Sequence, residues 1–120
     1  MKKAIVVLSD PQSESEESLG RLFNALAAAY EFKNNGEDVQ ILFQGAGTRW
    51  PEKLQNEDHP AYELFKEVED TVAGVSCGCA DVFDADPSGF DLINDSEVPG
   101  TTGLPSLSKM YDKGYNILTF

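Results

Sequence analysis

The chain is poor in positive charge and in the residues that build metal sites. Nine Lys and Arg side chains face 21 Asp and Glu, so the formal net charge is -12. A surface with this charge repels phosphate backbones, and we therefore expect no nucleic-acid binding. A structural zinc site normally takes four Cys and His ligands. With two cysteines and one histidine, the sequence predicts no metal site.

The sequence also lacks a long hydrophobic run. No stretch approaches the roughly 20 apolar residues that a membrane span requires. Ser9-Asp10-Pro11 interrupts the apolar run Ala4–Leu8 near the N-terminus, which argues against a signal peptide. We therefore expect a cytoplasmic protein with no membrane association and with reduced thiols. Its length and its 41% hydrophobic content suit a single globular domain over residues 1–120.

Strand-like and helix-like segments alternate along the chain. Short apolar runs predict strands at Ala4–Leu8, Val39–Phe43, Thr71–Ser76, Leu92-Ile93 and Tyr115–Phe120. Helical spacing predicts a long helix whose apolar stripe is Leu19, Leu22, Phe23, Leu26, Ala27 and Tyr30. Ser13 and Glu16 have the spacing of a capping box at its start.

Further helices are expected from Pro60 through Val68, from Ala80 until before Pro87, and over Pro105–Lys113, where Leu107, Met110 and Tyr111 face inward. This alternation predicts a three-layer α/β/α sandwich around a mostly parallel five-stranded sheet, with right-handed crossovers.

The only two cysteines, Cys77 and Cys79, follow the third predicted strand. Open α/β sheets place ligands and chemistry at the carboxyl ends of their strands. A buried apolar pair is the alternative interpretation, but a strand end beside Gly78 suits it poorly. A helix opening at Ala80 would favour a thiolate, whereas the three nearby aspartates oppose ionisation.

A second candidate site follows the second predicted strand. Its candidate ligand-binding residues are Gly45, Gly47, Thr48, Arg49 and Trp50. The glycines lack the rest of a dinucleotide or phosphate-loop motif, so no cofactor is expected, and a tight turn with positive φ is the alternative to ligand contact. The guanidinium could bind a small anion or form a salt bridge, with the indole packed in a subunit interface.

Parallel strands should bring these segments together. We expect Ser9-Asp10, the loop from Gly45 to Arg49, and the cysteine segment to meet at one edge of the sheet. His59, before Pro60, could be a general base, and the alternatives are that it caps a helix start or packs at the surface.

Several of these segments together resemble the DsrE-like family. They are the first strand, the long helix, Phe43 to Trp50, Asp58-His59-Pro60, the cysteine-bearing strand end and the closing Gly114 to Phe120. The resemblance covers almost the whole chain. It implies a small α/β protein with a five-stranded sheet that forms trimers or hexamers and carries sulfur as a persulfide on a cysteine after the third strand. Related sequences often have two cysteines separated by two residues, or a single one, whereas one residue separates them here. Cys79 matches the commoner position slightly better than Cys77.

Two functions follow as hypotheses. The first is a sulfur-carrier or thiol-redox protein that exchanges sulfur with a donor or acceptor protein, in which the second thiol resolves the persulfide as a strained disulfide. A carrier that only passes sulfur on performs group transfer, so the sequence leaves open whether the protein counts as an enzyme. The second is a non-catalytic oligomeric module that binds a small ligand at the carboxyl ends of the strands. The aromatic residues Trp50, Tyr62, Phe65 and Phe83 are the expected material of a subunit interface.

Overall fold

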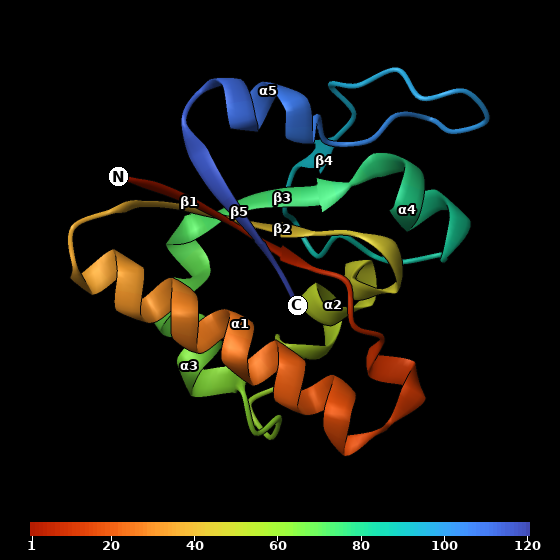
Figure 1. Cartoon of the computed structure of the whole chain (residues 1–120). Helices are drawn as coiled ribbons and strands as arrows, with labels where there is room; N and C mark the ends of the chain where they lie inside the picture. Colours follow the sequence, from red (N-terminus) through yellow and green to blue (C-terminus); the bar gives the residue numbers. More distant parts are fainter.

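The computed structural model describes all residues, 1–120, and is built on one five-stranded sheet (Figure 1). The strands are β1 (Lys2–Val7), β2 (Asp38–Phe43), β3 (Val72–Ser76), β4 (Leu92–Ile93) and β5 (Tyr115–Thr119). They lie in the order β4-β3-β2-β1-β5, and every neighbouring pair is parallel. Ile5 of the central strand β1 pairs with Ile41 on one side and Leu118 on the other. The predicted sheet is confirmed. The bounds of β4 are as predicted, and those of the other strands differ from the predictions by one or two residues.

Helices lie on both faces of this sheet (Figure 1). The α-helices are α1 (Glu16–Asn34), α2 (Trp50–Lys53), α3 (Tyr62–Val68), α4 (Cys77–Val82) and α5 (Leu107–Asp112). Three 3-10 helices, η1 (Pro11–Ser13), η2 (Gly45–Arg49) and η3 (Glu69–Thr71), join them to the strands. Helices α1 and α3 cover one face, while α5 lies on the other. The α/β/α sandwich is therefore confirmed. Even α1, the longest helix with 19 residues, lacks the apolar length of a transmembrane segment.

The main core lies between the sheet and the α1–α3 layer. Alternate strand residues such as Ile5, Ile41 and Phe43 point into it, where they meet Leu22 of α1 and Phe65 of α3. The ring centroids of Phe43 and Phe65 are 6.3 Å apart in an edge-to-face arrangement, which suits aromatic quadrupoles. Consecutive residues of β1 are buried on both faces, as expected for the central strand of a covered parallel sheet.

The start of α1 corrects the capping prediction. Ser15, rather than Ser13, caps the helix, since its side chain accepts a hydrogen bond from the Ser18 N–H over 3.0 Å. Ser13 belongs to η1, and Glu14 adopts a left-handed φ of 52°. The helix therefore cannot begin until the chain has turned at Glu14.

Three further predictions about helices are wrong. On α1, Ala27 and Tyr30 face solvent, and Ala25 and Ala29 complete the buried stripe instead. Tyr111 of α5 is 73% exposed rather than inward, because α5 packs against the edge strand β5 and no further element covers its outer side. Helix α4 begins at Cys77, three residues before Ala80, where the Ser76 side chain accepts a hydrogen bond from the Cys79 N–H.

Candidate functional site

The segments that follow β1, β2 and β3 meet at one edge of the sheet, as predicted. Trp50 Nε1 donates to the Ser9 carbonyl oxygen over 2.8 Å, and Arg49 Nη1 lies 3.3 Å from Asp10 Oδ1. Helix α4, which continues directly from β3, packs against η2. Arg49 also lies over the Phe83 ring, 5.3 Å from its centroid. The salt-bridge alternative for Arg49 is therefore the one that the structure shows.

Much of the loop after β2 is buried and supports the fold. Gly47 is buried, and a Cβ there would collide with the carbonyl group of Val7. Thr48 is also buried, and its hydroxyl donates to the Gly45 carbonyl oxygen over 2.8 Å. Gly45 itself has a φ of +57°, which confirms the tight-turn interpretation. Of the five candidate ligand-binding residues, only Arg49 lines one of the larger polar hollows described below.

Two of the aromatic residues expected at a subunit interface lie in the core. Trp50 is 2% exposed and Phe65 is fully buried, so neither can contribute to a subunit interface. Aromatic content alone does not say which residues pack inside the monomer, because the tertiary fold decides that. Oligomerisation itself stays a prediction.

Both cysteines lie in the first turn of α4, as free and half-buried thiols. Successive residues of an α-helix are rotated by about 100°, so side chains two residues apart point to nearly opposite sides. A disulfide between Cys77 and Cys79 would therefore require this turn to unwind. The helix gives the two thiols different surroundings.

Cys77 opens into a hollow of about 330 Å³ beside α4. Its Sγ lies 3.7 Å from Thr102 Oγ1. The rest of the lining is Ala80, Asp81, Asp84, Ala85, Pro87 and Leu92. Cys79 does not line this hollow or any other. Sequence reasoning missed Thr102, because only the fold brings a residue 25 positions away beside the thiol.

Gly78 explains why the distant loop reaches Cys77. Its N–H donates to the Gly103 carbonyl oxygen over 2.7 Å. A Cβ at Gly78 would stand 2.9 Å from that oxygen and 3.0 Å from Leu104 Cδ2, which is closer than side chains tolerate. The glycine between the two cysteines therefore allows the loop that carries Thr102 to lie directly on α4.

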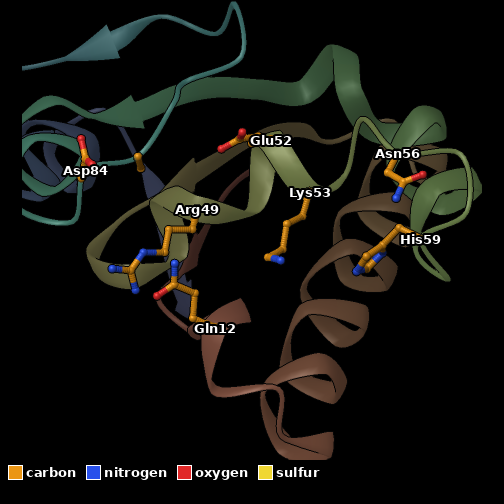
Figure 2. A pocket seen from close by; sticks show the side chains of 8 residues that line it. Gln12, Arg49, Glu52, Lys53, Asn56, His59 and Asp84 are labelled. Carbon is orange, nitrogen blue, oxygen red and sulfur yellow. The ribbon is translucent and has the colours of Figure 1, made fainter.

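A second, polar hollow of about 420 Å³ is shown in Figure 2. It is lined by Gln12, Arg49, Glu52, Lys53, Asn56, His59, Asp84 and Ala85. The two hollows share Asp84 and Ala85. Sequence reasoning had selected only Arg49 and His59 from this set, since Gln12, Lys53 and Asn56 belong to no motif.

His59 borders this hollow with a defined hydrogen bond. Its Nδ1 accepts from the Ala61 N–H over 3.1 Å, and Ala61 is the residue before α3. His59 therefore orders the turn that leads into α3, whose N-cap is Ala61, and its side chain does not itself cap the helix. Burial, and then the positive charge of Lys53, lower the pKa of His59 below its ordinary value of 6.5. Elsewhere in the chain, no group of three or more His, Cys, Asp or Glu side chains is arranged to hold a metal ion.

Comparisons with known proteins identify the family of this chain. An uncharacterized protein of Methanocaldococcus jannaschii is 29% identical over 121 aligned residues, which cover 98% of this chain and 94% of that protein. No solved structure shows a significant match. The sequence model of the DsrE/DsrF-like family matches residues 1–120. Because that match spans the whole chain, the protein belongs to the DsrE/DsrF-like family.

Proposed function

We propose that the protein is a cytoplasmic sulfur carrier that holds a persulfide on Cys77. The family relationship supports a role of the sulfur-relay type. The observation that carries the finer assignment is the place of Cys77, whose thiol opens into a hollow at the carboxyl end of β3. Cys79 lines no such hollow, although the family resemblance slightly favours its position.

The proposed reaction is exchange with a donor persulfide. The Cys77 thiolate attacks the terminal sulfur of R–S–SH, a new S–S bond forms on Cys77, and the donor's S–S bond breaks. The donor leaves as the thiolate R–S⁻, which keeps the electron pair of the broken bond, and the terminal sulfur keeps its proton. Attack of an acceptor thiolate on the terminal sulfur of the Cys77 persulfide passes that sulfur on by the same chemistry.

The charge around Cys77 indicates which partner surface fits it. Asp81 and Asp84 line the hollow, and no Lys or Arg does. The whole chain carries a formal charge of -12. A donor or acceptor protein with a basic surface would be steered to this site, whereas Asp81 and Asp84 would repel a small anionic donor from the Cys77 hollow itself. We also propose that the carrier works as a trimer or hexamer, as the family resemblance implies.

The second candidate is a non-catalytic module that binds a small ligand. The polar hollow beside Arg49 favours it, because that hollow is larger than the one at Cys77 and lies at the same edge of the sheet. This function needs no thiol.

Sulfur loading separates the two functions and the two cysteines. The protein, Cys77→Ser and Cys79→Ser are each treated with a low-molecular-weight persulfide, and intact mass reports the gain of one sulfur atom. We expect Cys79→Ser to load and Cys77→Ser not to load. The reverse pattern would move the carrier role to Cys79. If the unmodified protein gains no sulfur while its thiols react with an alkylating reagent, sulfur carriage is contradicted and the binding module takes its place.

A further inference from the structure

Two side chains that line the polar hollow shown in Figure 2, Asn56 and His59, have a hydrogen-bond acceptor that is already occupied. Asn56 Oδ1 accepts from the Asp58 N–H over 2.9 Å, which leaves the amide NH₂ group free to donate. His59 Nδ1 accepts from the Ala61 N–H, so the neutral ring carries its hydrogen on Nε2. These two residues therefore offer donors to a ligand, whereas the carboxylates of Glu52 and Asp84 in the same lining do not.

Lys53 adds a full positive charge. Five of the nine basic side chains form ion pairs, namely Lys3, Arg21, Lys33, Arg49 and Lys66. Lys53 forms none, in a chain where acidic residues outnumber basic ones by more than two to one. Figure 2 shows its side chain extending between Gln12 and His59. The ammonium group thus stands among the other free donors.

From this donor set we infer that the hollow binds a small tetrahedral oxyanion, of the sulfate or phosphate class. Lys53, Asn56 and His59 each supply N–H groups without a competing acceptor. Gln12 lines the same hollow on the Arg49 side, and its side chain makes no hydrogen bond within the protein. Four donor side chains suit the several acceptor oxygens of a tetrahedral anion better than the two oxygens of a carboxylate.

Acidic groups limit the size of the anion. Glu52 and Asp84 also line the hollow, and Figure 2 shows the carboxylate of Glu52 directed away from Lys53. Asp10 already neutralises much of the Arg49 charge. A compact anion at Lys53 would lie near fewer of these carboxylates than an extended polyanion would. The more distant acidic residues are screened beyond about 10 Å at 0.1 M ionic strength, so the local donors decide binding.

The inference does not rest on sulfur transfer. The anion site uses none of the thiols, and Cys77 lies in the neighbouring hollow, beyond Asp84. Cys77→Ser should therefore bind the anion as the unmodified protein does. Failure of sulfur loading and failure of anion binding are separate results.

Two side chains near this hollow can each be followed as a single NMR probe. His59 is the only histidine and Trp50 the only tryptophan, and their rings stand edge to face with centroids 6.0 Å apart. NMR signals of the imidazole ring and of the indole N–H are followed while sodium sulfate or sodium phosphate is added at pH 7. Sodium chloride at matched ionic strength is the reference. We expect saturable shifts with sulfate or phosphate and none with chloride.

Two variants test the residues. Lys53→Gln should weaken the apparent affinity about tenfold or more, because it removes a charged donor. Lys113→Gln makes the same change of charge at an exposed residue after α5 that forms no ion pair, and should leave the affinity unchanged. Gln12→Ala removes an exposed side chain without internal hydrogen bonds, so it keeps the fold and should also weaken binding.

Comparing the responses to sulfate and to phosphate shows which class of oxyanion the hollow binds. A response to sulfate alone, or to phosphate alone, supports the site and names its ligand class, and a response to both supports a general oxyanion site. The inference is overturned if neither anion shifts the signals beyond the chloride reference. It is equally overturned if Lys53→Gln and Gln12→Ala both bind as tightly as the unmodified protein.

Discussion

The indole N–H of Trp50 donates to the backbone carbonyl oxygen of Ser9 over 2.8 Å. This single hydrogen bond joins the segment after β1 to the helix α2 that follows η2 and β2. The Trp50 ring is buried at the same point. Trp50 is therefore a structural support of the sheet edge on which both hollows lie.

Replacing this tryptophan tests its supporting role. Trp50→Phe keeps an aromatic ring but removes the N–H donor, which leaves the Ser9 carbonyl without its partner. We expect the free energy of unfolding to fall by about 1–3 kcal/mol. Urea denaturation followed by circular dichroism measures it, since the variant has no tryptophan fluorescence. Tyr111→Phe, at a side chain that is 73% exposed, is the control and should change stability by less than about 0.5 kcal/mol.

Gly47 and Gly20 form a matched pair of glycine substitutions. Gly47→Ala should destabilise the protein by roughly 3 kcal/mol, because the new methyl group meets the Val7 carbonyl group at the end of β1. Gly20→Ala lies inside α1 with no atom within 4 Å of the new Cβ, and should stabilise by about 1 kcal/mol. Thermal unfolding of the two variants should shift in opposite directions. Equal shifts would contradict the tight fit of η2 against β1.

The contact between Cys77 and Thr102 should affect thiol reactivity. Thr102→Val keeps the side-chain shape and removes the hydroxyl that stands 3.7 Å from the sulfur. Losing this donor to the thiolate should slow alkylation of Cys77 about fivefold. The rate is measured in the Cys79→Ser background, so that Cys77 is the only thiol that can be alkylated. Thr119→Val, at an exposed position of β5, serves as the control, and an unchanged rate in Thr102→Val would remove Thr102 from the site.

His59 should make stability depend on pH. Its pKa is lowered in the folded protein, first by burial and then by the charge of Lys53. The unfolded chain therefore binds the proton more readily, so this contribution to stability is complete above the unfolded pKa of 6.5 and is lost as pH falls through the folded pKa. Protonation of Nδ1 would also displace the Ala61 N–H.

The matched variant is His59→Asn, which retains an acceptor near the Nδ1 position and does not titrate. The difference in unfolding free energy between the protein and this variant should shrink between about pH 7.5 and about pH 5. Carboxylates contribute equally to both proteins and cancel. A difference that stays constant with pH would contradict the proposed protonation.

The sheet, and the edge of the sheet at which the candidate site lies, could be predicted because both depend on local patterns in the sequence. Short apolar runs identified β1, β2, β3 and β5, and the alternation with helices required parallel pairing. That pairing in turn brought the segments of Asp10, Arg49 and Cys77 to one edge. The contents of the site could not be predicted in the same way. Thr102, Lys53 and Asn56 carry no motif, and their partners lie in other segments of the fold.

The sequence by itself determined the order of strands and helices, the acidic surface and the position of the cysteines after β3, because hydrophobic periodicity and charge are properties of the local chain. Tertiary structure decided the rest. It started α4 at Cys77 through the Ser76 cap, and so turned the two thiols to opposite sides of one helix. It buried Trp50 in the core and left Lys53 unpaired in a polar hollow. These outcomes depend on which surfaces pack together, and packing is settled by contacts between residues far apart in the chain.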